Sequence, residues 1–170
     1  MNYRIIGAIM VIISSSAVGF SIAAAHRNEA KSLMQLIRAL EFMSCELEYR
    51  LPPLPELCRL TAAQMTGSLR ELFVLLEGEL RMQESADVYS CMTVVLQRMD
   101  KLPQTVKTNL MLLGKTLGRF DLSGQLSGIA SVIQLCRRDL DGLLCNQDVR
   151  LRSYRTLGIC AGVALVILFI

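Results

Sequence analysis

The sequence predicts an all-α protein, a bundle of six helices held between two apolar terminal segments. Apolar residues recur at intervals of three and four through the middle of the 170-residue chain. Proline and glycine interrupt this pattern repeatedly, and almost no stretch alternates as a half-buried strand does. Both ends of the chain carry long uncharged runs. One soluble helical domain of ordinary size therefore fits between the two ends.

The last helix is predicted to be the longest, from Leu122 to Ile170. A spacing of four and three residues in alternation puts one set of apolar side chains on a single helical face. This set is Leu122, Leu126, Ile129, Ile133, Cys136, Leu140 and Leu143. The face turns polar and basic after Asn146, and no charge follows Arg155. We therefore expect one continuous helix to leave the bundle and enter a membrane.

Five shorter helices are predicted before this one, over about residues 28–50, 54–65, 68–83, 85–101 and 103–117. The first, fourth and fifth of these have apolar side chains at helical spacing on one face. The side chains expected in the core are Leu36, Leu40, Met43, Leu47, Val88, Met92, Val95, Met99, Val106, Leu110, Leu113 and Leu117.

The boundaries of these helices follow from residues that stop or cap them. Prolines at positions 52, 53 and 55 end the first helix, since proline cannot continue a helix interior. Ser68 with Glu71 forms a predicted capping box for the third helix, and Ser85 caps the fourth. Pro103 suits the first turn of the fifth, and Gly118 ends it. The sixth opens at Asp121 or Ser123.

The first apolar segment, Ile5 to Ala25, has no charge over 21 residues, or about 31 Å of helix. This length matches the hydrocarbon thickness of a bilayer, so we expect a transmembrane helix. The alternative is a cleaved secretory signal, because Arg4 gives a positive start and the alanines at 23–25 resemble a cleavage site.

The second segment, Thr156 to Ile170, is shorter, at about 22 Å. Tyr154 at the headgroups and a snorkelling Arg155 extend the span that it covers. A helix buried in the protein core is the alternative, but the unbroken apolar ending leaves that helix no polar face. Gly158 and Gly162 have the spacing that lets membrane helices pack closely, here against the first span.

Basic residues predict the orientation and the domain limits. His26, Arg27 and Lys31 follow the first span, and Arg150 and Arg152 precede the second. By the positive-inside rule the central domain faces the cytosol. The expected organisation is a transmembrane helix at residues 1–25, a cytosolic bundle at 26–155 and a second transmembrane helix at 156–170.

Composition argues against several classes of function. Acidic and basic residues are interleaved and aromatic residues are few, so no nucleic-acid partner is expected. The six cysteines form no Cys-x-x-Cys pair, which argues against a structural metal site. We expect them to be buried thiols in a reducing compartment. A disulfide framework is the alternative only if the domain is exported. Gly114-Lys115-Thr116 lacks the first glycine of a phosphate-binding loop, where Asn109 stands. No catalytic constellation or cofactor site is predicted.

Two motifs remain, at predicted corners between helices. The first corner holds Glu46 and Tyr49, then Pro53-Leu54-Pro55-Glu56. The second corner follows Gly114-Lys115-Thr116-Leu117 and holds Gly118, Asp121 and Gln125. Physical chemistry alone explains both as local capping and turn formation, and it does not separate this role from partner binding.

These motifs, in this order, resemble the stage III sporulation protein AB family over essentially the whole chain. The resemblance rests on an N-terminal span, Glu46-Leu47-x-Tyr49, Pro53-Leu54-Pro55-Glu56, Leu117-Gly118-x-x-Asp121-x-x-x-Gln125 and Tyr154-Arg155-Thr156-Leu157-Gly158 with Gly162. Two departures stand out, because Ser44 takes the place of a frequent acidic residue and Tyr89 that of a frequent tryptophan.

The resemblance implies a fold like the six-helix antiparallel cytoplasmic bundles of the F-type platform proteins of type II secretion and type IV pilus systems. It implies a non-enzymatic platform subunit of a secretion-like channel complex between mother cell and forespore. The implied partners are a secretion-type ATPase and other membrane subunits in the mother-cell membrane around the forespore, with homo-oligomerisation left open. The alternatives are an adaptor that oligomerises without an ATPase and a membrane-tethered sensor or enzyme for a small ligand.

Overall fold

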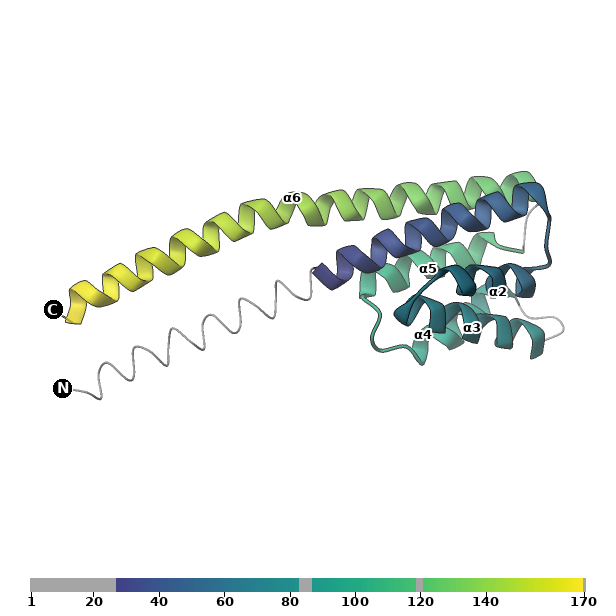
Figure 1. Ribbon diagram of the computed structural model, residues 1–170, viewed down its shortest axis with the longest axis horizontal. Coiled ribbons are helices and arrows are strands. Elements are labelled where there is room, and N and C mark those ends of the chain that lie inside the picture. Colours follow the sequence, from purple (N-terminus) through teal and green to yellow (C-terminus); the bar gives the residue numbers. More distant parts are fainter. Residues whose placement is uncertain (1–26, 83–86, 119–120, 170) are drawn as a thin grey trace.

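The computed structural model describes residues 27–82, 87–118 and 121–169, with side chains described up to residue 145. Over these residues the chain forms six helices and no strand (Figure 1). The first is described from residue 27 to residue 49 and is named helix 27–49. The others are α2 (Leu54–Gln64), α3 (Gly67–Met82), α4 (Val88–Gln97), α5 (Gln104–Thr116) and α6 (Leu122–Phe169). The all-α fold class is confirmed.

The helices pack as a bundle in which neighbours along the chain lie side by side. Contacts join α2 to α3, α3 to α4, α4 to α5 and α5 to α6. Helix 27–49 runs antiparallel to the first part of α6 (Figure 1), and Arg137 Nη2 on α6 donates to Glu41 Oε1 at 2.7 Å. A second bond ties helix 27–49 to α5, because Thr105 Oγ1 donates to Glu29 Oε1 at 2.5 Å.

The predicted core faces are confirmed. Phe73 is the largest fully buried side chain, and it lies in one cluster with side chains from every helix. The twelve predicted core residues of the five shorter helices are all buried in this cluster. On α6, Ile129 and Cys136 are buried, and the remaining five residues of the predicted face pack against the cluster while partly exposed.

The long last helix is continuous, as predicted. It has 48 residues and is therefore about 72 Å long. Starting from the Arg137–Glu41 pair, equal steps along the two antiparallel helices bring residue 150 level with Asn28. The backbone of α6 thus continues for about 30 Å beyond that level. We call the end of the bundle near Asn28 the proximal end, and the end where α6 begins the distal end (Figure 1).

Two predicted boundaries are wrong. Helix α3 already begins at Gly67, whose φ of 64° turns the chain, so Ser68 lies in the first turn and not at the predicted cap. Helix α4 ends at Gln97 and not near Lys101. Met99 and Leu102 remain buried although they follow the helix, since the segment before Pro103 turns back over the core. The predicted cap Ser85 lies outside the described residues.

The structure does not support the two predicted membrane spans. None of the helices, as far as residues are described, combines the length and apolar character needed to cross a bilayer. The first predicted span, residues 1–25, lies outside the described residues. For the second, residues 156–170, the structure describes helical backbone to Phe169 but no side chains, so the packing of Gly158 and Gly162 also stays a prediction.

Candidate functional site

The two predicted corners meet at the distal end of the bundle. A Cβ atom added to Gly118 would lie 3.1 Å from Leu54 Cδ1 and 3.0 Å from Val88 Cγ2. Gly118 has a φ of 77°, in the left-handed region that favours glycine. The end of α5 and the beginnings of α2 and α4 therefore converge on one junction, which glycine keeps tightly packed.

Asp121 begins α6 by capping it. The backbone N–H of Gly124 donates to Asp121 Oδ1 at 3.1 Å, and the Ser123 hydroxyl donates to Asp121 Oδ2 at 2.8 Å. These hydrogen bonds, first that from Ser123 and then that from Gly124, lower the pKa of the Asp121 carboxyl below its ordinary value. Of the two predicted caps, the structure selects Asp121.

The distal end also exposes apolar side chains. Tyr49, the last residue of helix 27–49, is 79% exposed, and Leu51, just beyond the helix, is 62% exposed. Leu51 has a φ of 49°, a left-handed conformation that costs a non-glycine residue about 1–2 kcal/mol. Pro53 follows, exposed and extended, as the N-cap residue of α2. We call Tyr49, Leu51 and Pro53 the apolar tip.

Glu46 lies one helical turn before Tyr49, and the negative charge of its carboxylate is only partly neutralised. Its side chain is 16% exposed, and its Oε2 lies 3.7 Å from Nη1 of the exposed Arg50. Oε2 is buried and accepts no hydrogen bond from the described residues. A carboxylate oxygen in this state gains from a hydrogen-bond donor that a partner brings.

The other predicted corner residues have distinct places. Glu56 pairs with Arg59 within α2, where Arg59 Nε donates to Glu56 Oε2 at 2.8 Å and lowers the pKa of that carboxyl. Gln125 is half-buried in the first turn of α6, and its backbone N–H donates to the Asp121 carbonyl at 2.9 Å. The structure thus brings Leu54 and Gly118 into contact, whereas the carboxylate of Glu56 is held within its own helix.

A partly buried polar pair between α5 and α6 escaped the sequence analysis. Asn109 is buried, and its Nδ2 donates to Asp139 Oδ2 at 2.9 Å. Burial and the nearby Asp139 carboxylate raise the pKa of the neighbouring Cys136 thiol to about 11. No local spacing signals this pair, because the two residues lie 30 positions apart and meet only when α5 packs on α6.

A contact beside the junction involves one of the family departures. The ammonium of Lys115 lies 5.4 Å from the centre of the Tyr89 ring, within cation–π range. A Cβ atom on Gly114 would lie 3.2 Å from the Tyr89 Cα, so glycine permits this close approach of α4 and α5. Gly114 and Lys115 therefore serve helix packing at this end.

The five cysteines with described side chains are all free. Cys58, Cys91 and Cys136 are buried as predicted, while Cys45 and Cys145 are exposed. Burial raises the pKa of the Cys58 thiol to about 12, which keeps it protonated and unreactive. Within the described ranges, no three cysteine, histidine or acidic side chains are grouped as metal ligands.

Comparison with known proteins identifies the family. The family model for stage III sporulation protein AB matches residues 4–170. The chain belongs to the stage III sporulation protein AB family. A solved structure of a stage III sporulation protein AB (SpoIIIAB) has the same fold, with a TM-score of 0.62 at 20% identity. The match covers 72% of this chain and 98% of that one. A search of curated protein sequences found no match.

Membership of the stage III sporulation protein AB family confirms the resemblance that the corner motifs carry. In this chain those motifs lie at one end of the bundle, at the junction of Leu54 and Gly118, the cap Asp121 and the apolar tip.

Proposed function

We propose that this stage III sporulation protein is a non-enzymatic platform subunit of the SpoIIIA complex between mother cell and forespore. In this proposal the bundle is anchored by helices at both ends in the mother-cell membrane around the forespore, faces the cytosol, and resembles the F-type platform proteins of type II secretion. The distal end receives a cytosolic, secretion-type ATPase, and the membrane helices contact other subunits of the complex.

The observation that carries the proposal is the apolar tip beside the under-neutralised carboxylate of Glu46. Tyr49 and Leu51 are among the most exposed large apolar side chains of the described bundle, and the strained backbone of Leu51 presents one of them. Tyrosine is one of the residue types enriched in binding hot spots, and the buried Glu46 oxygen offers a hydrogen-bond acceptor beside it. The backbone of α6 leaves the bundle at the opposite end, so the tip points away from the proposed membrane.

The mechanism that we propose is mechanical. A rigid bundle joined to a single long helix passes a nucleotide-driven movement from the ATPase at the distal end to membrane neighbours at the proximal end. The continuity of α6 supports this mechanism, since no loop interrupts the helix between the two ends.

Co-purification of the full chain with the ATPase of the same complex tests the proposal. Tyr49→Ala should weaken binding at least tenfold, as truncation of a hot-spot aromatic does. Val74→Ala is the matched control, because Val74 is 50% exposed on α3 and should bind normally. Equal loss in both variants, or no loss in either, would contradict a partner site at the tip.

The second corner is tested in the same assay. Gln125→Ala should weaken co-purification while the helical content and melting temperature stay unchanged. A parallel fall in binding and melting temperature would assign Gln125 a structural role. Normal complex formation by every tip variant, together with self-association of the chain, would favour the adaptor that works without an ATPase.

Membrane sidedness is tested separately. A single cysteine replacing the exposed Ala63, in a chain with all native cysteines removed, is probed in sporulating cells with an impermeant thiol reagent. Labelling only after permeabilisation supports a cytosolic bundle. Labelling of intact cells before engulfment would overturn the proposed ATPase contact.

A further inference from the structure

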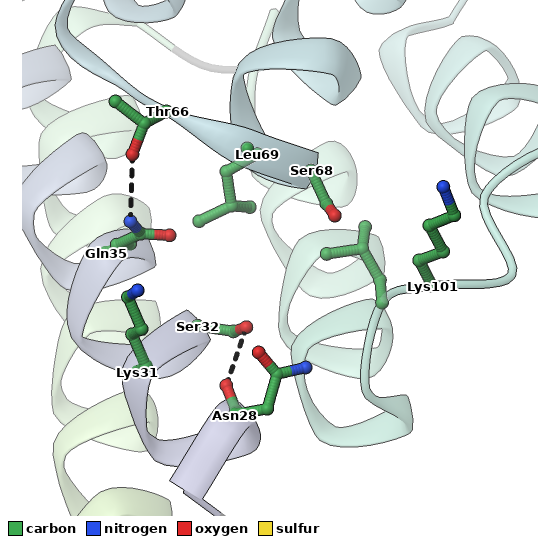
Figure 2. A pocket seen from close by; sticks show the side chains of 10 residues that line it. Asn28, Lys31, Ser32, Gln35, Thr66, Ser68, Leu69 and Lys101 are labelled. Atoms are coloured by element: carbon green, nitrogen blue, oxygen red, sulfur yellow. Dashed lines mark hydrogen bonds between the residues drawn. The ribbon is translucent and has the colours of Figure 1, made fainter. Parts of the chain in front are cut away.

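The proximal end of the bundle contains a small polar pocket. Helix 27–49, the start of α3 and the segment between α4 and α5 form it, with a volume of about 180 Å³ (Figure 2). Its ten lining residues are mainly polar and include Asn28, Lys31, Ser68 and Lys101. This set includes two lysines and no acidic residue.

The walls of the pocket are held in place by hydrogen bonds of their own. Ser32 Oγ donates to the Asn28 carbonyl oxygen at 2.9 Å, and Gln35 Nε2 donates to Thr66 Oγ1 at 3.2 Å. The second bond joins helix 27–49 to the turn before α3 and so fixes one side of the opening.

Its two lysines lack neutralising partners. Figure 2 shows Lys31 and Lys101 on opposite sides of the pocket, with Ser68 and Asn28 between them. Neither ammonium group forms an ion pair with the residues that the structure describes, although five other basic side chains of the bundle do. Two uncompensated positive charges at one polar hollow attract a compact anion.

The volume of the pocket limits its ligand to one small anionic group. Pockets that enclose drug-sized ligands or nucleotides measure roughly 300–1,000 Å³, well above this one. Lysine binds phosphate as a point charge from any direction, and hydroxyl and amide groups such as those of Ser68 and Asn28 can donate to the remaining oxygens. From these features we propose that the pocket binds a phosphate group, supplied by the headgroup of an anionic phospholipid.

The position of the pocket favours the lipid as the source. Asn28 and Lys31 follow the predicted first span, which ends at Ala25, by about 5 and 9 Å of helix. The potential of a membrane surface decays over a screening length of roughly 8 Å at physiological salt, so a charge at about this distance still experiences part of it. This choice of source rests on the proposed membrane anchoring, whereas the affinity of the pocket for phosphate does not.

The test uses the full chain, freed of lipid in neutral detergent, with binding measured by native mass spectrometry and by thermal shift. The probes are phosphatidylglycerol, phosphatidylcholine and glycerol phosphate. We expect phosphatidylglycerol to bind more tightly than phosphatidylcholine, and glycerol phosphate to bind weakly. Lys31→Gln and Lys101→Gln should each weaken phosphatidylglycerol binding about fivefold, and the double variant about 30-fold.

Lys115→Gln is the matched control. It removes the same charge from the distal end of α5, about 20 Å along the helix from Lys101, and should leave phosphatidylglycerol binding unchanged. Equal weakening by the control would mean general charge attraction and would overturn the proposal. The proposal would also be overturned if phosphatidylglycerol did not bind. It would likewise be overturned if an acidic peptide, and neither phosphate probe, competed for the pocket.

The possible outcomes distinguish the proposed phosphate site from the proposed membrane anchoring of the protein. Lysine-dependent binding of glycerol phosphate without phosphatidylglycerol would overturn the lipid source and keep the phosphate site. Lysine-dependent phosphatidylglycerol binding in detergent, combined with a failed sidedness experiment, would support the pocket and overturn the proposed topology.

Discussion

The distal and proximal ends of this bundle are built in different ways. At the distal end, backbone constraints dominate, with Gly118 packed on Leu54 and Leu51 held in a left-handed conformation. At the proximal end, polar side chains line an open pocket together with two lysines that have no ion-pair partner among the described residues. The first end is shaped sterically and presents apolar surface, whereas the second is shaped by charge. The contrast suits a protein surface at one end and an anionic surface at the other.

The contrast extends along α6, where Gly128 lies toward the distal end and Gly142 lies nearer the proximal end. A Cβ atom on Gly128 would lie 2.6 Å from Thr116 Cβ, while one on Gly142 would meet no atom within 4 Å. We expect Gly128→Ala to lower the free energy of unfolding by about 1–3 kcal/mol, because α5 and α6 must separate. Gly142→Ala should instead raise it, by up to about 1 kcal/mol, through helix propensity.

Urea unfolding of the two glycine variants in detergent, followed by far-UV circular dichroism, measures both changes. Similar effects at the two positions would contradict the steric difference between the ends.

The junction itself should be the next most sensitive. Gly118→Ala places a side chain in a left-handed conformation and against Val88 and Leu54, so the free energy of unfolding should fall by about 1–2 kcal/mol. Gly78→Ala on α3, where a Cβ atom has open space, is the control and should be neutral or stabilising. A harmless Gly118→Ala would show that the junction is looser than its contacts indicate.

The cap of α6 gives the distal end a dependence on pH. Because the pKa of Asp121 is lowered in the fold, its stabilisation is present above the ordinary value of 3.8 and is lost as the pH falls through the lowered pKa. Asp121→Ala should therefore melt at a lower temperature than the wild type at neutral pH, and this difference should shrink in acid. Asp121→Asn, which keeps an acceptor without a charge, should not show the same convergence.

The smallest expected change is at the apolar tip. Leu51→Gly relieves the left-handed strain but adds flexibility to the unfolded chain, for a net gain of about 0.5 kcal/mol in the free energy of unfolding. Leu51→Ala removes the same apolar surface and keeps the strain, so it should show no gain. If the tip binds a partner, both variants should weaken that binding, and stability and binding would then change in opposite directions for Leu51→Gly.

Much of the fold could be predicted from the sequence because the residues that form, stop and cap a helix lie close together along the chain. The apolar face of α6 and the stops at Pro53 and Gly118 follow from spacing and from restricted backbone angles. The end of α4 was misplaced because Met99 continues the apolar pattern from a turn, where it is buried without being helical.

The site could be predicted only in part, for the same reason. The corner motifs identified the distal end, since proline, glycine and capping acids act on their own neighbours. The pocket was missed because Lys31, Ser68 and Lys101 come from three segments that meet only through packing. The left-handed Leu51 was also missed, since leucine gives no local signal for that conformation.

The hydrogen bond between the buried Asn109 and the partly exposed Asp139 limits how α6 can move. A piston-like slide of α6 past α5 by one helical turn, about 5.4 Å, would carry Asp139 away and leave the buried Asn109 amide without its acceptor, at a cost of roughly 1–3 kcal/mol. A tilt of α5 and α6 together keeps the hydrogen bond intact. The hydrogen bond therefore favours one register of these two helices, and a change of angle costs less than a slide when one end of the bundle is displaced.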